Sequence, residues 1–350
     1  MRLCINIFLS LSVLLALVVS GCGDVHSSYI TVEGEALGTF VQLKCETSVE
    51  PAVIESIIED VDAEAKASMS IFDESSLLSR INNNQTDSLD IHIANNIALA
   101  QRFSELSNGA YDITIRPLTE AWGFGRSVAK QRVNVDSLLE FVGCDKLRVE
   151  EGRIVKGDSR VQIDLNSIAK GYVVDFVAER LEALGIANYM VNIGGEIRCK
   201  GYNGRGERWS IGIETPYDGN MAMDSFEKVI YVEDQAVATS GNYRRFYLDA
   251  EGNKVVHTID PRTGYSVVSD LLSATVVAPT CAEADAAATM FMAMGATEEA
   301  LRLAELCAES YGWKYYFIYA EGEGYRIESS AEYREIKGIR ETTLYRHNIG

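Results

Sequence analysis

The sequence has few basic residues. Its 32 lysines and arginines stand against 51 aspartates and glutamates, which gives a formal net charge of −19. A surface of this sign repels nucleic-acid phosphates and anionic lipid headgroups. The composition therefore excludes nucleic acid as the expected partner, and it suits a protein that contacts other proteins.

Cysteine patterns typical of metal sites are also missing. The chain has seven cysteines, but no Cys-x-x-Cys pair, and the spacings match no zinc site. Five cysteines remain once the N-terminal segment is set aside: Cys45, Cys144, Cys199, Cys281 and Cys307. Their odd number allows one or two disulfides at most, and buried free thiols are the equal alternative.

Three common enzyme signatures are absent as well. The sequence contains no Gly-x-Ser-x-Gly, no His-Glu-x-x-His and no phosphate loop ending in Gly-Lys-Ser/Thr. Gly194-Gly195 follows a predicted strand but lacks the spacing of a dinucleotide fingerprint. Without these motifs, the sequence gives no support to a serine hydrolase, a zinc protease or a nucleotide-binding Rossmann domain.

Long apolar runs are confined to the N-terminus. Ile5 to Val19 is an apolar run of about 15 residues after the positive Arg2, which is too short to span a bilayer but typical of a signal peptide. The run ends in Val19-Ser20-Gly21-Cys22, which resembles a bacterial lipobox. We expect a lipoprotein signal peptide over residues 1–21, lipidation of Cys22 and a tether over residues 22–28. An ordinary signal peptide with a chance cysteine is the alternative.

Helix and strand patterns are mixed without a steady βαβ rhythm. Helical spacing predicts helices over residues 51–67, 75–82, 93–107, 168–184, 281–294 and 298–307. Strand patterns occur over residues 29–44 (two strands), 161–165, 189–193, 196–201, 209–213, 228–232, 236–240, 243–247, 255–260, 271–277, 314–319 and 325–329. Residues 126–150 read as a variable loop and helix. We predict an α+β fold, with mixed or antiparallel sheets and packed helices in a single large domain over residues 29–345.

The segment from Val161 to Asp175 is the first candidate site. It reads as a strand that stops at Asn166-Ser167 and turns into a helix, whose N-terminus directs unpaired backbone N–H groups at whatever lies in front of it. Asp164, Lys170 and Asp175 add more charge than a structural strand–helix unit needs. The corner is therefore a candidate anion-binding and catalytic site.

Asp285 and Thr289 form a second candidate site. They are four residues apart on the predicted helix, so both side chains lie on one face, among alanines. Hard oxygen ligands of this kind suit Mg²⁺ shared with phosphate oxygens. An aspartate that merely lies near a threonine on a helix surface is the simpler alternative.

Two further segments contain residue types suited to catalysis or ring binding. His257 stands just before Asp260-Pro-Arg-Thr-Gly264, a turn signature, and is a candidate base or, alternatively, a packing residue. Trp122-Gly-Phe-Gly125 places two aromatic rings among glycines. Such a loop can stack on a planar ring, or it can fill a core.

Taken in order, these segments resemble one family. The motifs that carry the resemblance are Met69-Ser70, Tyr111-Asp112, Pro117-Leu118, Trp122-Gly-Phe-Gly125, Asp164 through Ile168-Ala-Lys-Gly-Tyr172 to Asp175, Asn192-Ile-Gly-Gly-Glu196, Thr239-Ser-Gly-Asn-Tyr243, His257 to Gly264, and Ala284-Asp285 to Thr289. The sequence is similar to FAD:protein FMN transferases, the ApbE-type flavin transferases, from about Leu37 to Gly295. Many members of that family are bacterial lipoproteins.

The resemblance implies a function and a set of site residues. Such enzymes bind FAD and Mg²⁺ and move FMN onto a Thr or Ser hydroxyl of a partner protein, which releases AMP. Carried over by position, the FAD site comprises Leu37, Ala110, Tyr111, Asp112, Asp164, Lys170 and Ile259. The metal ligands are Ser167, through its backbone carbonyl, Asp285 and Thr289. Some members have a carboxylate where this chain has Ala288, so water or phosphate ligands would take its place.

The resemblance also implies catalytic roles and partners. His257 is the expected general base, Lys170 adds positive charge near the cofactor, and Asp175 is expected to be structural. The expected acceptor carries a Ser/Thr-Gly-Ala-Ser/Thr type site on a membrane redox-complex subunit. The lipid anchor would hold the enzyme on the periplasmic side of the inner membrane, with the outer membrane as the alternative. An FAD pyrophosphatase giving FMN and AMP, and a non-catalytic FAD-binding lipoprotein, are the alternative functions.

Overall fold

The computed structural model describes residues 28–125, 134–216, 226–243, 246–249 and 251–333. The predicted signal peptide, Cys22 with its tether up to residue 27, and residues 334–345 of the predicted domain lie outside these ranges. Within them, no helix combines the length and the apolar character that crossing a bilayer requires.

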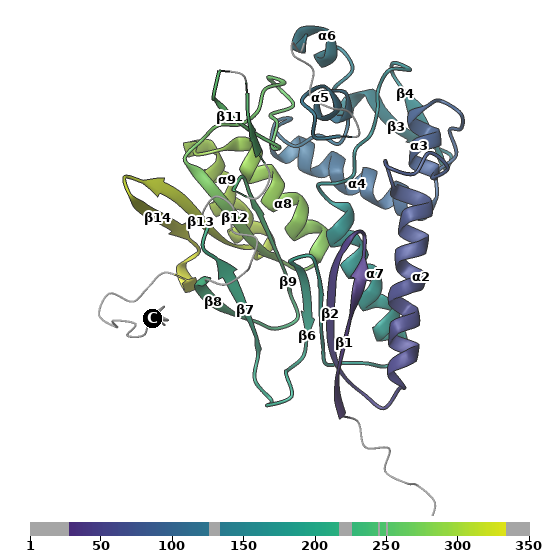
Figure 1. Cartoon of the computed structure of the whole chain (residues 1–350), viewed down its shortest axis with the longest axis vertical. Coiled ribbons are helices and arrows are strands. Elements are labelled where there is room, and N and C mark those ends of the chain that lie inside the picture. Colours follow the sequence, from purple (N-terminus) through teal and green to yellow (C-terminus); the bar gives the residue numbers. More distant parts are fainter. Residues whose placement is uncertain (1–27, 126–133, 217–225, 244–245, 250, 334–350) are drawn as a thin grey trace, which may run out of the picture.

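One eight-stranded sheet organises the fold (Figure 1). Its strands, in spatial order, are β1 (Ser28–Ala36), β2 (Thr39–Thr47), β5 (Tyr189–Ile193), β6 (Glu196–Lys200), β9 (Ala236–Gly241), β12 (Leu271–Ala278), β13 (Lys314–Glu321) and β14 (Gly324–Ser329). All neighbouring strands pair antiparallel. The predicted α+β class with antiparallel pairing is confirmed.

The two faces of the sheet bury different partners. Along β13, Tyr315, Phe317 and Tyr319 point into the larger core and Tyr316 and Ile318 into a smaller one, as the two-residue period of a strand requires. The larger core is closed mainly by α2 (Pro51–Met69), α3 (Leu77–Asn82), α4 (Ile91–Leu106), α7 (Ala169–Ala183), α8 (Cys281–Met294) and α9 (Glu298–Tyr311). The smaller core is closed by the hairpin of β7 (Trp209–Glu214) and β8 (Phe226–Val232).

A cap of short elements lies beyond the end of the sheet where α4 crosses (Figure 1). It comprises α5 (Arg116–Ala121), α6 (Val135–Leu139), the 3₁₀ turn η1 (Cys144–Lys146) and the hairpin β3 (Leu147–Glu150)–β4 (Arg153–Lys156). The hairpin of β10 (Phe246–Leu248) and β11 (Lys254–Val256) lies on the same side, and η2 (Ala331–Tyr333) ends the described chain. β3 was not expected, because residues 126–150 were predicted as a variable loop and helix; residues 126–133 of that stretch lie outside the described residues.

The predicted strand over Val161–Leu165 is wrong. The segment is buried, but only Gln162 makes a strand-like bridge, to Ile115. The side-chain amide of Asn82 takes the place of a neighbouring strand: its Oδ1 accepts the Ile163 N–H at 2.7 Å and its Nδ2 donates to the Ile163 carbonyl at 2.8 Å. A side-chain partner of this kind leaves no strand-pairing signal in the local sequence.

The helix and strand predictions otherwise differ mainly at their ends. The predicted strand over residues 255–260 contracts to β11, and the one over residues 243–247 corresponds to β10. The five cysteines of the described chain are all buried free thiols. Of the two alternatives for these cysteines, disulfides or free thiols, the second holds.

Asp175 joins α7 to α8, as expected of a structural residue. Its carboxylate accepts the N–H groups of Cys281 (2.9 Å) and Ala282 (2.8 Å) at the start of α8, and it lies 2.7 Å from Arg198 Nη1. Asp175 therefore caps a helix that is 106 residues away in sequence and balances a half-buried arginine.

Replacing Asp175 by alanine is expected to lower the free energy of unfolding by about 3 kcal/mol, because it uncaps α8 and leaves Arg198 with only its longer ion pair to Glu182, at 3.6 Å. Urea denaturation would measure the change. The matched control is Glu179→Ala, which removes an exposed acid from the same helix. Equal stability of the two variants would contradict this role.

Candidate active site

Asp285 joins the two candidate sites that are far apart in sequence. Its Oδ2 accepts the backbone N–H of Gly171 at 3.0 Å, across 114 residues. Gly171 permits this approach, because a Cβ at that position would lie 2.3 Å from the Cys281 carbonyl oxygen. The Lys170–Gly171 turn of α7 and the first turns of α8 therefore form one site.

Lys170 lies between two carboxylates. Its Nζ is 2.6 Å from Glu196 Oε2, and Asp285 also acts on its charge. Burial opposes the charged form of Lys170, but Glu196 and Asp285 outweigh it and raise the pKa of the ammonium. Burial, and then the charge of Glu196, raises the pKa of Asp285. The cluster is acidic overall, which favours a cation there.

Glu196 was not predicted as a site residue. Its side chain is buried, and although Oε2 is close to Lys170 Nζ, this oxygen makes no hydrogen bond of acceptable geometry within the described chain. The contact is therefore a close ion pair. In the sequence this glutamate stood only as the last residue of the Asn192-Ile-Gly-Gly-Glu196 motif, after a turn in which Gly194 and Gly195 have positive φ, +64° and +106°.

Ser167 and Tyr111 face one another at the same corner. The Tyr111 hydroxyl lies 2.9 Å from Ser167 Oγ, and burial raises the pKa of Tyr111 well above its ordinary value. Ser167 lies just before α7 and Asp285 accepts the N–H of Gly171 in the first turn of α7, so all three side chains lie around the start of that helix. Ala110 is fully buried beside Tyr111. This arrangement brings Ser167 and Asp285, two of the predicted metal ligands, to the same corner.

The Asp112 side chain supports the loop that precedes α5. Its carboxylate accepts the N–H of Thr114 (2.7 Å) and the N–H of Cys144 (2.6 Å), as well as the Thr114 hydroxyl. Both carboxylate oxygens of Asp112 thus already accept hydrogen bonds from the protein. A contact of Asp112 with FAD stays a prediction.

Hydrogen bonds along and just after β9 join the predicted ligand Thr289 to the segment that contains His257. Thr289 Oγ1 lies 3.3 Å from Ser240 Oγ, and two residues later Asn242 Oδ1 accepts the Thr258 hydroxyl at 2.7 Å. His257 is the residue before Thr258, is half-buried, and lies edge-on to Phe124 with ring centroids 6.3 Å apart. The Thr239–Tyr243 segment therefore links the predicted metal ligand Thr289 to the segment of the candidate base His257.

The aromatic loop after α5 packs against the turn at Asp260–Gly264. The indole N–H of Trp122 donates to the Gly264 carbonyl at 2.8 Å, and both Trp122 and Phe124 pack against a small apolar cluster. Ile259 is buried within that cluster. The loop therefore fills part of a core beside His257, and its stacking on a planar ring stays a prediction.

Leu37 occupies the tight turn between β1 and β2. Both Leu37 (φ +53°) and Gly38 (φ +74°) are left-handed, and the Leu37 N–H donates to Asp62 Oδ1 at 2.7 Å. The turn adjoins the one before Glu196, because the Gly194 N–H donates to the Phe40 carbonyl. Leu37 thus lies at the same end of the sheet as Glu196 and Lys170.

The buried Asp164 carboxylate lies beside a second residue that the sequence did not single out, Arg116. Asp164 Oδ1 accepts the Asn166 N–H at 2.9 Å, and Oδ2 lies 3.3 Å from Thr119 Oγ1. Burial raises the pKa of Asp164, against the opposing charge of Arg116. Arg116 reads in the sequence only as the residue before Pro117 at a helix start.

Oxygen donors are the ligands available to a cation at this site. Within the described residues, no group of three or more His, Cys, Asp and Glu side chains is arranged to hold a metal. One carboxylate, two side-chain hydroxyl groups and backbone carbonyls suit Mg²⁺, which keeps several water ligands and also binds substrate phosphate oxygens. They do not suit zinc, which prefers Cys and His ligands.

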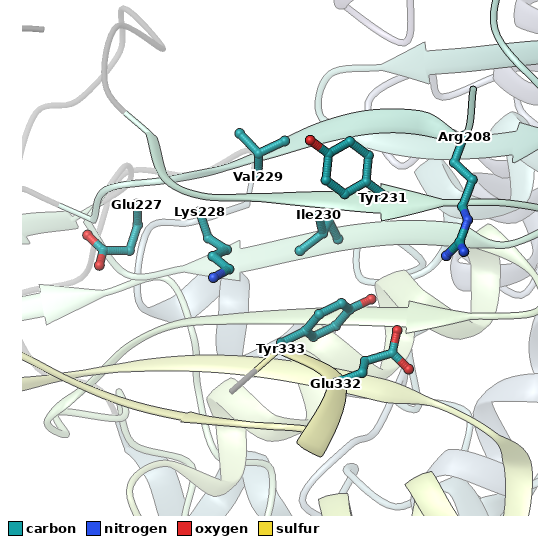
Figure 2. A pocket seen from close by; sticks show the side chains of 8 residues that line it. All are labelled: Arg208, Glu227, Lys228, Val229, Ile230, Tyr231, Glu332 and Tyr333. Atoms are coloured by element: carbon teal, nitrogen blue, oxygen red, sulfur yellow. The ribbon is translucent and has the colours of Figure 1, made fainter. Parts of the chain in front are cut away.

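An open pocket on another part of the molecule is separate from this site. It measures about 590 Å³ and opens between β8 and η2 (Figure 2). Its lining residues are Arg208, Glu227, Lys228, Val229, Ile230, Tyr231, Glu332 and Tyr333. None of the candidate site residues lines it, so the size of a hollow does not locate the chemistry in this chain.

Comparison with known proteins gives a consistent result. A curated FAD:protein FMN transferase from Haemophilus influenzae is 34% identical over 348 residues, which cover 95% of this chain and 98% of the relative. The flavin transferase ApbE from Vibrio cholerae superposes with a TM-score of 0.75 at 32% identity, covering 87% of this chain and 98% of that structure. The apo form of the Pseudomonas stutzeri flavinyl transferase ApbE gives 0.77 at 28% identity, covering 87% and 95%.

The sequence pattern of the ApbE family matches residues 37–312, which include every candidate site residue described above except the lipidation residue Cys22. Together with the 34% identity over nearly the whole chain, this match establishes the family. The chain belongs to the ApbE family.

Proposed function

We propose that the protein transfers FMN from FAD to a Thr or Ser hydroxyl of an acceptor protein and releases AMP. The observation that carries this proposal is the hydrogen bond from Gly171 to Asp285, which assembles Lys170, Glu196 and the two predicted metal ligands of α8 into one acidic site. The relatives that share the fold and the family are flavin transferases by name. The net charge of −19 disfavours nucleic acid as a binding partner and agrees with a protein as the acceptor.

Asp285, Thr289 and the backbone carbonyl of Ser167 would hold Mg²⁺, with waters or phosphate oxygens completing the shell, since Ala288 offers no ligand. When bound, Mg²⁺ supplies charge neutralisation on the pyrophosphate and orients the reacting phosphorus. Lys170, near the N-terminus of α7, adds a second positive charge on the same side.

The bond changes balance without any further reactant. The acceptor hydroxyl oxygen bonds to the phosphorus of the FMN half, and the pyrophosphate P–O bond to AMP breaks, with its electron pair passing to the AMP phosphate. The hydroxyl proton passes to a base, for which His257 is the candidate. The Phe124 ring packs edge-on against the His257 ring. The hydrogen bond from the Thr258 hydroxyl to Asn242 holds the residue next to His257 in the chain.

Replacing His257 by alanine is expected to lower the transfer rate by about a hundredfold or more, because a positioned general base contributes about that factor. FAD affinity should change much less. Single-turnover transfer followed by protein-bound flavin fluorescence, beside a fluorescence titration of FAD, separates the two effects. A loss confined to FAD affinity would identify His257 as a contact residue instead.

One incubation separates transfer from its alternatives. The domain without residues 1–21 is mixed with FAD, Mg²⁺ and an acceptor that carries a Ser/Thr-Gly-Ala-Ser/Thr site. Flavin covalently attached to the acceptor supports the proposed transfer. Free FMN and AMP without attachment indicate an FAD pyrophosphatase, and FAD bound but unchanged indicates a flavin carrier.

The predicted location follows from residues 1–28, of which residues 1–27 lie outside the described residues. We propose that Cys22 is lipidated and anchors the enzyme to the periplasmic side of the inner membrane, where a membrane redox-complex subunit would be its acceptor. Without residues 1–21 the protein has 31 basic and 51 acidic residues, a net charge of about −20. Electrostatic attraction to anionic lipid therefore contributes little to membrane binding. A Cys22→Ser variant that still partitions into detergent would contradict the anchor.

A further inference from the structure

One edge of β8 forms a wall of the open pocket between β8 and η2 (Figure 2). Within the described chain, β8 pairs only with β7, so its other edge has no neighbouring strand. Five consecutive residues of β8, Glu227 to Tyr231, line the pocket. Because successive side chains point to opposite faces of a strand, a pocket that all five line runs along the edge itself. Such an edge presents backbone N–H and C=O groups with which an extended segment can pair.

The opposite wall of the pocket contains a buried hydroxyl group without a partner. Tyr333 of η2 is 8% exposed, and its hydroxyl makes no hydrogen bond to any part of the chain that the structure describes. Burial raises the pKa of Tyr333, so the hydroxyl keeps its proton and can donate. A buried polar group without a hydrogen bond is costly, so this hydroxyl calls for an acceptor from outside the chain.

Lys228 supplies a second donor to the same pocket. Its side chain extends from β8 towards η2 (Figure 2), and among the described residues it has no ion-pair partner. Arg208 and Glu332, which also line the pocket, do have ion-pair partners, at 3.7 and 3.0 Å. Glu227 precedes Lys228 on the strand and therefore points to the opposite face. An ammonium group only donates hydrogen bonds, so Lys228 and the Tyr333 hydroxyl together suit a carboxylate.

One end of the β8 edge leads to the candidate active site. The first residue of β8 lies opposite Glu214 of β7, and Glu214 Oε2 accepts the Tyr243 hydroxyl at 3.3 Å. Asn242, the residue before Tyr243, accepts the hydroxyl of Thr258 at 2.7 Å. His257 is next to Thr258 in the chain. A protein segment that lies along β8 therefore continues towards the candidate base.

We propose, on the basis of the function proposed above, that the β8 edge and its pocket bind an extended segment of the acceptor protein. The transfer reaction requires a second protein at His257, and the edge leads there. The segment pairs its backbone with β8, and one of its acidic side chains accepts hydrogen bonds from Lys228 and Tyr333. Val229 and Tyr231, exposed on the other face of β8, add apolar contact. The pocket volume, about 590 Å³, is typical of a binding site.

The test compares Tyr333→Phe and Lys228→Gln with Tyr325→Phe. Tyr333→Phe removes only the hydroxyl, and Tyr325 is an exposed residue of β14 outside the pocket. Transfer is measured with a redox-complex subunit from the same organism that carries a Ser/Thr-Gly-Ala-Ser/Thr site, and with a capped peptide of that site alone. We expect the KM for the subunit to rise about tenfold in Tyr333→Phe and in Lys228→Gln. The KM for the peptide and both kcat values should stay unchanged, and Tyr325→Phe should match the wild type.

Three results would overturn the inference. An unchanged KM for the subunit in Tyr333→Phe and Lys228→Gln removes the contact, and an equal loss for the peptide moves the effect to the reacting groups. A lysine on an edge strand can also keep two copies of a chain apart. A changed oligomeric state of Lys228→Gln in size-exclusion chromatography, with the KM for the subunit unchanged, would identify the edge as a contact between copies.

Stability gives an independent check on the hydroxyl. Tyr333→Phe should melt no lower than the wild type, because the hydroxyl that it removes has no partner within the described residues. A lower melting temperature would show that the hydroxyl already bonds within the enzyme, and this result also contradicts the proposed contact.

Binding measured without turnover separates this inference from the proposed function. The Kd of the subunit for the enzyme is measured by calorimetry in the absence of FAD. A wild-type protein that transfers FMN beside a Tyr333→Phe variant with an unchanged Kd refutes only the role of the pocket. A wild-type protein that transfers nothing, but binds the subunit about tenfold more tightly than Tyr333→Phe, refutes the transferase proposal and supports the pocket.

Discussion

Replacing Asp285 by alanine is expected to lower Mg²⁺-dependent FMN transfer by roughly a thousandfold. Metal stabilisation of developing charge contributes several kcal/mol to such a reaction, and about 4 kcal/mol corresponds to that factor. Asp285 is the one carboxylate among the three proposed ligands, so without it the hydroxyl and backbone oxygens of Thr289 and Ser167 hold a dication poorly. Transfer measured over a range of Mg²⁺ concentrations would show the loss.

Asp285→Asn distinguishes the metal role from a structural one. An asparagine oxygen at this position still accepts the Gly171 N–H, so the contact between α7 and α8 is kept while the negative charge is lost. We expect the asparagine variant to be nearly as inactive as the alanine variant and nearly as stable as the wild type. Glu283→Ala is the control on the same helix, since Glu283 pairs with Arg102 outside the site. Retained Mg²⁺-dependent transfer in Asp285→Ala would remove Asp285 from the metal site.

Local signals in the sequence were sufficient for most helices and strands. The predicted bounds of α8 match the structure, because Thr280 caps its first turn, with its hydroxyl accepting the Glu283 N–H, and Gly295 ends it with positive φ. The order of the strands was beyond such reasoning. β2 pairs with β5, more than 140 residues later, and no local period encodes which edge meets which.

The candidate site divides in the same way. Lys170, Asp285 and His257 stand in recognisable motifs, so resemblance could single them out. Glu196 also stands in a motif, but its burial against Lys170 arises only in the folded chain, as do the two buried guanidinium nitrogens of Arg116 that lack hydrogen bonds. Asp112 shows the reverse case, because its carboxylate is committed to Thr114 and Cys144. Burial and hydrogen-bond satisfaction depend on distant residues, which a single sequence does not place.

Gly171→Ala should destabilise the protein by about 3 kcal/mol, although glycine-to-alanine changes inside helices ordinarily stabilise. The new Cβ would lie 2.3 Å from the carbonyl oxygen and 2.6 Å from the carbonyl carbon of Cys281. These are backbone atoms of α8, so no side chain can turn away, and the two helices must separate. Separation also breaks the hydrogen bond from the residue 171 N–H to Asp285 Oδ2.

The effect on transfer should exceed the effect on stability, because the separation displaces Asp285 from Lys170 even in molecules that stay folded. Urea denaturation gives the first quantity, and transfer at a temperature where the variant is fully folded gives the second. Gly34→Ala is the matched control, since a Cβ there meets no atom within 4 Å. A Gly171→Ala protein as stable and as active as the Gly34→Ala protein would contradict the assembly of the site through the contact between α7 and α8.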